Sequence, residues 1–300
     1  MIIDGGYFIF CSEVRKPMDF NHIQAVIADL DGTLAVKGQL PGPLTLKALG
    51  ILHDHGIRLG IASGRVINEA LRKRSSEWGL PFQFDVLIGM NGGQVLLTDT
   101  EEFFEQYALS RETLKEIMLW MEPLGLIASR YEGDHMVASA MDEQQAASAE
   151  RNHMEIIDSH GDFDRLCVTP CHTLIYRYTP EKEKQVKAFI TDYLNAHPDT
   201  DYTSVNPSAG IVEIVHKKCC KGVGIQVYSE KSGIPKDDIL GMGDMDNDLT
   251  LITECGIGAA LRNGSDTLKA AADFVTEYPC SEDGAGRFLF DHWIGPLGWD

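Results

Sequence analysis

The sequence has few basic residues: 26 Lys and Arg stand against 45 Asp and Glu, which gives a formal net charge of −19. Nucleic acids and anionic membrane surfaces are bound by basic faces, so this balance argues against both kinds of partner. The chain also lacks an apolar run of the roughly 18 residues that span a bilayer. We therefore expect no nucleic-acid or membrane partner, and an anionic substrate would need a metal or a few placed cations.

Cysteine is too sparse and irregular to form a disulfide framework, because seven residues are scattered over the chain and their number is odd. Free thiols are typical of a reducing compartment. The first residues have an apolar patch but neither a basic segment before it nor a small-residue cleavage site, so we expect an N-terminal extension over 1–17 and not a signal peptide. These features predict a cytoplasmic protein, and nothing in them distinguishes a monomer from a dimer.

The fold class follows from an alternation of apolar runs and helical patterns. Strands are predicted at 25–28, 58–62 and 84–88, with helices at 41–56 and 66–78 between them. This order is typical of a parallel sheet with helical crossovers, and the same alternation returns after about residue 207. We therefore predict an α/β protein with a Rossmann-like, doubly wound parallel sheet at its core.

The middle of the chain breaks this alternation, which indicates a second domain inserted into the first. Ser110 is a candidate N-cap for a helix over 111–122, and several strands and one further helix follow it without strict order. We predict an α+β cap domain. The expected division is 18–98 and 208–300 for the core, and 99–207 for the cap.

Polar residues follow four of the predicted core strands directly: Asp29, Ser63, Asn91 and Asp244. In an open parallel sheet, ligands bind at the carboxyl edge of the strands. The sequence therefore predicts that Asp29 and Asp244 meet in space.

Asp29 and Asp31 form a carboxylate pair in the run DLDGTL. One member of such a pair can stay ionised as a nucleophile while the other acts as a general acid and base. The same Asp-x-Asp-Gly spacing occurs in calcium loops, but residues 33–40 contain no acid, and this excludes that interpretation.

Three further groups are weak signals alone. Ser63 and Gly64 stand at a predicted strand-to-helix turn, where a hydroxyl and free N–H groups can hold a phosphate. Lys221 opens a predicted helix, where a lone lysine is usually a solvated surface charge. Asp244 and Asp248 lie four residues apart across a turn, and paired acids of this kind suit Mg²⁺, although they also cap helices.

Taken in order, DLDGTL at 29–34, ASGR at 62–65, the lysine of CKG at 221 and GDMDND at 243–248 resemble the motifs of the haloacid dehalogenase superfamily of phosphohydrolases. The turn at 91–93, the large insert and the tail with NG and EDG resemble its Cof-type branch, which has an α/β cap of subclass IIB type. The resemblance covers about residues 20 to 295.

The resemblance implies a Mg²⁺-dependent phosphatase that hydrolyses phosphomonoesters of small metabolites, such as a sugar phosphate or a phosphorylated cofactor. It implies an aspartyl-phosphate on Asp29, with Asp31 as acid and base. The alternatives are a phosphomutase of the same fold and a catalytically silent binding module. The implied metal ligands are Asp29, the Asp31 main-chain carbonyl and Asp244, with Asp248 behind them. The implied phosphate ligands are Ser63, Gly64, Lys221 and Asn247, and Arg65 and Asn91 are possible substrate contacts.

Charge explains why these parts occur together. Three ionised acids are balanced by Mg²⁺ and Lys221, so a phosphate monoester can enter a nearly neutral site despite the acidic chain. Substrate choice is expected to lie in the cap, which covers the site and excludes water. The cap residues that we consider candidates are Tyr131, Glu132, His135 and Met136.

Overall fold

The structure is a computed structural model that describes residues 19–300. The larger of its two sheets has eight strands. In spatial order they are β14 (Phe274–Val275), β13 (Ile257–Ala260), β12 (Ile239–Gly243), β1 (Ala25–Ala28), β2 (Arg58–Ala62), β3 (Val86–Gly89), β4 (Gln94–Leu97) and β5 (Glu102–Glu105). The strands from β14 to β3 are parallel, and β4 and β5 extend the sheet as antiparallel strands. The predicted parallel core is confirmed, with an antiparallel hairpin that the sequence pattern did not indicate.

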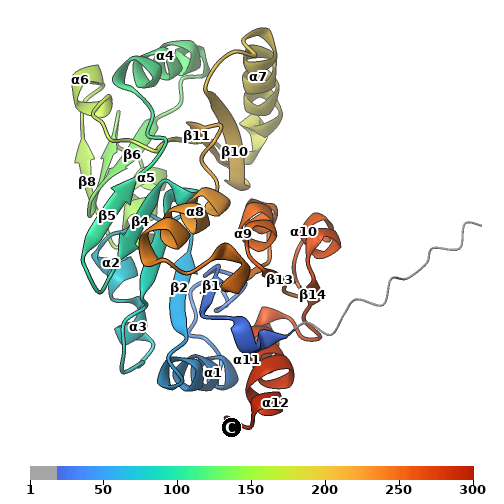
Figure 1. Cartoon of the computed structure of the whole chain (residues 1–300). Helices are drawn as coiled ribbons and strands as arrows, with labels where there is room; N and C mark the ends of the chain where they lie inside the picture. Colours follow the sequence, from blue (N-terminus) through green and yellow to red (C-terminus); the bar gives the residue numbers. More distant parts are fainter. Residues whose placement is uncertain (1–18) are drawn as a thin grey trace, which may run out of the picture.

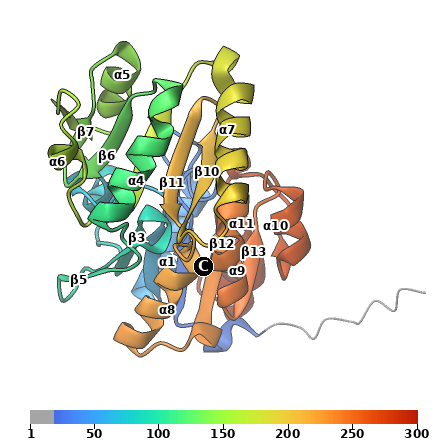
Figure 2. The ribbon, with the colours of Figure 1, turned by 90° about the horizontal axis from the view of Figure 1, so that it is seen from above.

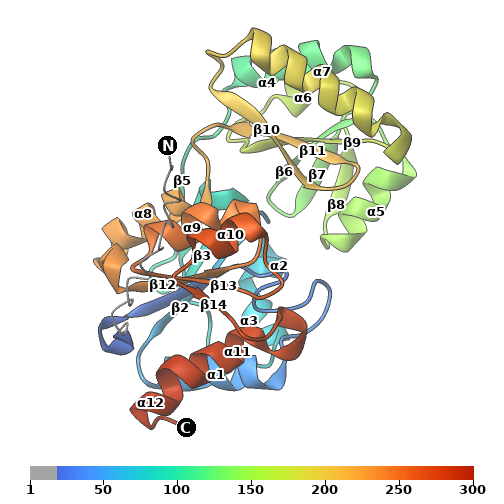
Figure 3. The same ribbon diagram turned by 90° about the vertical axis from the view of Figure 1, so that its right-hand side faces the viewer.

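Helices cover both faces of this sheet, as a doubly wound fold requires (Figure 3). Strand β1 shows the two-sided burial directly, because Val26 and Ala28 pack in one apolar cluster while Ala25 and Ile27 pack in another. This is the alternation of a strand that is buried on both faces. The helices on the first face are α1 (Pro43–Asp54) and α11 (Gly284–Leu289), and those on the second are α8 (Lys221–Ser232), α9 (Leu249–Glu254) and α10 (Asp266–Ala271). The chain ends after α12 (Gly295–Leu297).

A second sheet of six strands forms the cap domain above the core (Figure 1). Its order is β10 (Tyr202–Ser208), β11 (Ile211–His216), β9 (Thr173–Arg177), β6 (Ala128–Glu132), β7 (His135–Ala138) and β8 (Glu155–Asp158). Helices α4 (Arg111–Met121) and α7 (Glu183–Ala196) lie along one face of this sheet, as Figure 2 shows. The shorter helices of the cap are α5 (Glu143–Arg151) and α6 (Phe163–Leu166). Ser110 caps α4 as predicted, since its hydroxyl accepts a hydrogen bond from Thr113 N.

The division between core and cap differs from the expected boundaries at 98/99 and 207/208. Strand β5 pairs with β4 in the core sheet, so the core continues past residue 98. Strand β11 pairs with β9 in the cap sheet, so the cap continues past residue 207. We therefore propose that the cap spans about residues 107–217 and that two short segments join it to the core. The expected extension over 1–17 lies outside the described residues.

The predicted helix over 66–78 is also different, because the structure has two short helices there, α2 (Glu69–Arg72) and α3 (Arg74–Glu77). Asn68 caps the first by accepting a hydrogen bond from Leu71 N, so the helix begins three residues later than predicted. Lys73 then leaves helical geometry and separates the two.

The expectations about a membrane partner and about free thiols can be compared with the structure of residues 19–300. No helix in this range is long and apolar enough to cross a membrane. The cysteines among them are all free thiols.

Candidate active site

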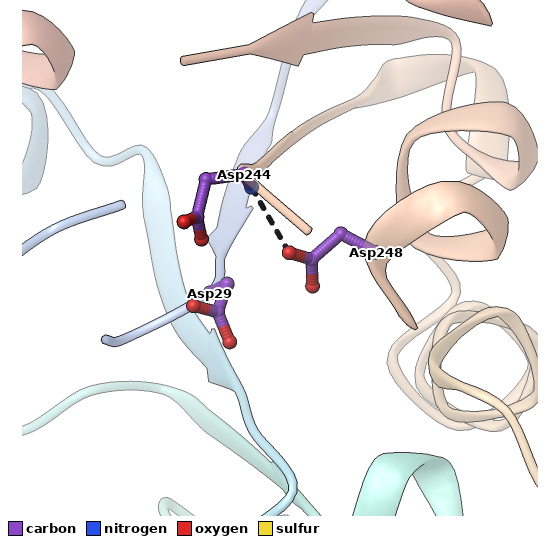
Figure 4. A group of neighbouring side chains, drawn as sticks. All are labelled: Asp29, Asp244 and Asp248. Atoms are coloured by element: carbon purple, nitrogen blue, oxygen red, sulfur yellow. Dashed lines mark hydrogen bonds between the residues drawn. The ribbon is translucent and has the colours of Figure 1, made fainter. Parts of the chain in front are cut away.

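The carboxyl edge of the core sheet gathers the residues that follow its strands. Asp29 N donates to Met242 O of β12, and Ser63 N donates to Ile88 O of β3, so neighbouring strands hold both residues at the same edge. The predicted meeting of Asp29 and Asp244 is confirmed. One ligand atom each of Asp29, Asp244 and Asp248 lies within 4.8 Å of the others, and Figure 4 shows the three carboxylates turned toward one another.

Lys221 is not a surface charge, because its side chain is 0% exposed. It is the first residue of α8, and its Nζ donates to Asp29 Oδ1 at 2.5 Å and to Asp248 Oδ1. Burial opposes its charge, but the two carboxylates outweigh burial and raise the pKa of Lys221 above its usual value. The ammonium group is therefore held charged between two acids from different parts of the chain.

Asp248 organises the turn after β12. Its Oδ2 accepts hydrogen bonds from Asp244 N at 3.0 Å and Met245 N at 3.1 Å, and its Oδ1 faces Lys221. Both of its oxygens are therefore occupied by the protein. The spacing of four residues across the turn has placed Asp248 behind Asp244, with 1% of it exposed.

Asp244 is fixed from the opposite side by the turn that follows β1. Thr33 Oγ1 donates to Asp244 Oδ1 at 3.1 Å. Gly32 has a φ of +102°, and a Cβ atom there would lie 2.3 Å from Asp244 Oδ2, so only glycine lets the two turns approach this closely. Neither Thr33 nor Gly32 was predicted as a site residue, although both lie inside the DLDGTL run.

Asn263 is a further side chain at this site that the sequence analysis did not assign. Its Nδ2 donates to Gly32 O at 2.9 Å and to Asp244 Oδ2 at 3.3 Å, while its Oδ1 accepts from Cys280 N. It therefore ties the two acidic turns to the C-terminal part of the core. The sequence feature that could have indicated a role for Asn263 is its place in the Asn-Gly pair of the C-terminal part of the chain.

The acidic cluster carries more negative charge than its own residues neutralise. Three carboxylates share one buried ammonium group. Burial raises the pKa of Asp29 to about 7, although Lys221 opposes the rise, and burial together with Asp248 raises the pKa of Asp244 to about 6. A cation beside Asp29 and Asp244 would remove this penalty. Buried carboxylate oxygens fit a hard divalent cation such as Mg²⁺.

Asp31 is not part of this cluster. Its Oδ2 accepts two hydrogen bonds from Arg65, at 3.1 Å from Nε and 2.7 Å from Nη2. Both side chains are about one-third exposed, at 30% and 28%. Among the described residues, Asp31 Oδ1 accepts no hydrogen bond. The two acids of the predicted pair therefore differ in surroundings: Asp29 is buried beside lysine, and Asp31 is accessible beside arginine.

The remaining predicted residues line the same edge. Ser63 is buried, and its Oγ accepts from Arg65 N at 3.2 Å. Asn247 Nδ2 donates to Asn91 Oδ1 at 3.3 Å, which joins the turns after β3 and β12. A Cβ at Gly64 would lie 3.3 Å from Asn91 Nδ2, so Gly64 faces this pair. Polar groups that follow β2, β3 and β12 thus lie at the same edge of the sheet as the acidic cluster.

The cap reaches the core beside these residues. Val66 and Met90, the neighbours of Arg65 and Asn91, pack in one apolar cluster with Met136, and Tyr131 is partly buried against it. The other two cap candidates have cap partners: Glu132 pairs with Arg130 and Arg165, and His135 lies 3.4 Å from Glu155. Tyr131 and Met136 therefore pack on the core, and Glu132 lines with Tyr131 a cavity between cap and core that Val66 and Met90 also line.

Comparison with known proteins gives the family. Residues 26–289 match the family model described as haloacid dehalogenase-like hydrolase. A *Bacillus subtilis* relative, 5-amino-6-(5-phospho-D-ribitylamino)uracil phosphatase, is 22% identical over 89% of this chain and 96% of its own length. A *Mycoplasma pneumoniae* putative phosphatase is 24% identical, with the same coverage.

Solved structures of low sequence identity share the fold. A *Thermotoga maritima* protein, TM0651, has a TM-score of 0.78 at 21% identity and covers 90% of this chain and 97% of its own. A sugar phosphatase of subclass IIB, BT4131, has a TM-score of 0.70 at 22% identity, covering 92% of this chain and all of its own. Core and cap are therefore both part of the shared architecture.

Proposed function

The chain belongs to the haloacid dehalogenase-like hydrolases, and from that premise we propose that it hydrolyses phosphomonoesters of small metabolites through a phosphorylated Asp29. The observation that carries the proposal is Asp29 itself: a buried carboxylate at the end of the central strand, bonded to the buried ammonium of Lys221. The relatives named phosphatases support the reaction class.

Asp29 and Asp244 would hold Mg²⁺, with the Asp31 main-chain carbonyl as a further ligand and Asp248 behind them. When bound, the ion supplies positive charge beside the phosphate oxygens. The donor set fits this ion, because three buried carboxylates share one ammonium group and so carry excess negative charge.

In the first step an oxygen of Asp29 attacks phosphorus, and the bond between phosphorus and the leaving alcohol oxygen breaks. Asp31 donates a proton from Oδ1 to that oxygen, so the alcohol leaves neutral. Arg65 holds Oδ2 of Asp31, which fixes the direction of Oδ1. Lys221 favours the ionised form of Asp29 and lies where it can contact the phosphoryl oxygens.

In the second step a water molecule attacks the phosphorus of the aspartyl-phosphate. Asp31, now a carboxylate, takes a proton from that water, and the bond between phosphorus and Asp29 breaks to release phosphate. Ser63, the Gly64 N–H and Asn247 would hold the phosphoryl oxygens, and Asn91 would position Asn247. Asp31 thus donates a proton in the first step and accepts one in the second.

The test is phosphate release from a panel of phosphorylated metabolites, measured with Mg²⁺ and with EDTA. We expect release that needs Mg²⁺ and disappears in Asp29→Asn, which removes the nucleophile but keeps the side-chain size. Asp19→Asn, a change at an exposed aspartate outside the site, is the matched control. Release that persists in EDTA, or in Asp29→Asn, would refute the proposal. The cytoplasmic location stays a prediction.

A further inference from the structure

We propose that Glu213 and Tyr131, on the cap sheet, bind the leaving group and select an uncharged, hydroxyl-rich alcohol such as a sugar or polyol. This inference rests on the proposed phosphatase function and names the substrate class that it would accept. No motif of the sequence points to Glu213, which lies between apolar residues in the strand IVEIVH.

The strand register puts both residues on one face of the cap sheet. Glu213 of β11 lies opposite Ile175 of β9, and Ile175 lies opposite Ser129 of β6. Directly opposite residues point to the same face, and so do residues two apart on one strand. Tyr131, two residues after Ser129, therefore shares a face with Glu213.

That face looks toward the active site. The other face is covered by α4 and α7, which lie on the far side of the cap sheet from the core in Figure 3. Met136, opposite Tyr131 in the register, packs on Val66 and Met90 of the core. The Arg65 guanidinium, which holds Asp31, lies close enough to influence the Tyr131 hydroxyl.

Glu213 is an acceptor that the protein has not used. Among the described residues its carboxylate makes no hydrogen bond and no close ion pair. Its neighbour Arg177 donates to Ser129 Oγ at 3.0 Å, Gln145 Oε1 at 3.2 Å and Ser148 Oγ at 2.5 Å, which holds α5 on the sheet, and its side chain also hydrogen-bonds the Tyr131 hydroxyl. Burial raises the pKa of Glu213 to about 7, with Arg177 opposing the rise. A carboxylate removed from water without donors has its hydrogen-bonding capacity left for a ligand.

The charges around this carboxylate define the ligand. An anionic leaving group would face the Glu213 carboxylate, and a cationic one would face the Arg177 and Arg65 guanidinium groups. Neutral hydroxyl groups avoid both repulsions, since a carboxylate accepts hydrogen bonds from them and the Tyr131 hydroxyl, which accepts from Arg177, can donate its proton to them. A sugar or polyol attached to the phosphate provides such groups.

The experiment compares kcat/KM for a hexose phosphate, phosphoglycolate and p-nitrophenyl phosphate in the wild type, Glu213→Gln and Glu155→Gln. Glu155 is the matched control, an exposed carboxylate on the same sheet. We expect the wild type to prefer the hexose phosphate. In Glu213→Gln, a lost hydrogen bond to a charged group should lower kcat/KM for the hexose phosphate by about 10- to 100-fold, chiefly through KM, and much less for p-nitrophenyl phosphate. Phosphoglycolate should gain relative to the hexose phosphate.

Equal losses with all three substrates would overturn the inference, because they would show a structural role. So would a wild type that prefers phosphoglycolate. In both cases phosphatase activity itself would stand. Tyr131→Phe, which removes a hydroxyl alone, should repeat the pattern with a smaller loss. No release from any of the three compounds would refute the proposed function instead, and the inference with it.

Discussion

Replacing Lys221 by methionine tests whether its ammonium group holds the site together. Methionine keeps the length of the side chain and removes its charge, which leaves the carboxylates of Asp29 and Asp248 without their cationic partner. The side chains of Lys221 and Asp248 are 0% and 1% exposed, so water does not screen the loss. Removing one partner of a buried ion pair costs about 3–5 kcal/mol. That is a large part of the roughly 5–15 kcal/mol by which domains are stable.

The assay is urea unfolding followed by circular dichroism, in EDTA and then in Mg²⁺. We expect Lys221→Met to lose about 3–5 kcal/mol in EDTA, and Lys218→Met, at an exposed position just before α8, to lose little. Mg²⁺ should add more stability to Lys221→Met than to the wild type, because the carboxylates that have lost their ammonium partner bind the ion more tightly. Lys221→Met combined with Asp248→Asn should be more stable than Lys221→Met alone.

A loss below about 1 kcal/mol in EDTA, which is the size expected of a solvated surface pair, would refute the stabilising role of the Lys221 ammonium group. A response to Mg²⁺ equal to that of the wild type would also contradict it. In that case the cluster would not carry the excess negative charge that we attribute to it.

Three other predictions concern Gly32, Glu213 and Asp134. Gly32→Ala should lower the melting temperature and nearly abolish activity, because its Cβ would meet Asp244 Oδ2 at 2.3 Å; unchanged kinetics would contradict this. Burial raises the pKa of Glu213 to about 7 from an ordinary 4.5, so the wild type loses stability as pH rises between these values. Glu213→Gln should therefore stabilise the protein more at pH 8 than at pH 5, by up to about 3 kcal/mol. Equal effects at the two pH values would refute the burial of a charged Glu213 as the cause. Asp134→Ala removes the cap oxygen that accepts from Glu69 N at 3.0 Å, so proteolysis of the segments joining cap and core should be faster, and unchanged cleavage would count against a holding role.

The core was predictable because its strands are buried on both faces and end in turns of distinctive chemistry. Val26 and Ile27 belong to opposite apolar clusters, so the run had to be apolar throughout. The edge strands were not predictable in this way. Strand β5 reads EFFE and is mostly exposed, so it carries neither the alternation nor the apolar run that indicates a strand. The sequence analysis therefore expected the core to end at residue 98, whereas β5 continues the core sheet beside β4.

The site was predictable as a set of residues but not as a set of contacts. The places of Asp29 and Asp244 directly after predicted strands implied that they would meet, and the parallel pairing of β1 with β12 explains why they do. The burial of Lys221 depends on where α8 packs, and no local pattern encodes that. The pairing of Asp31 with Arg65 and the position of Glu213 depend equally on contacts between distant segments.

The covalent mechanism is tested most directly by quenching the enzyme in acid during turnover of a hexose phosphate with Mg²⁺ and mapping phosphoryl groups by mass spectrometry. We expect a phosphoryl group on the peptide that contains Asp29, and none in Asp29→Asn. Rapid turnover by the wild type with no phosphorylated Asp29 under rapid quenching, or turnover retained by Asp29→Asn, would contradict the covalent mechanism.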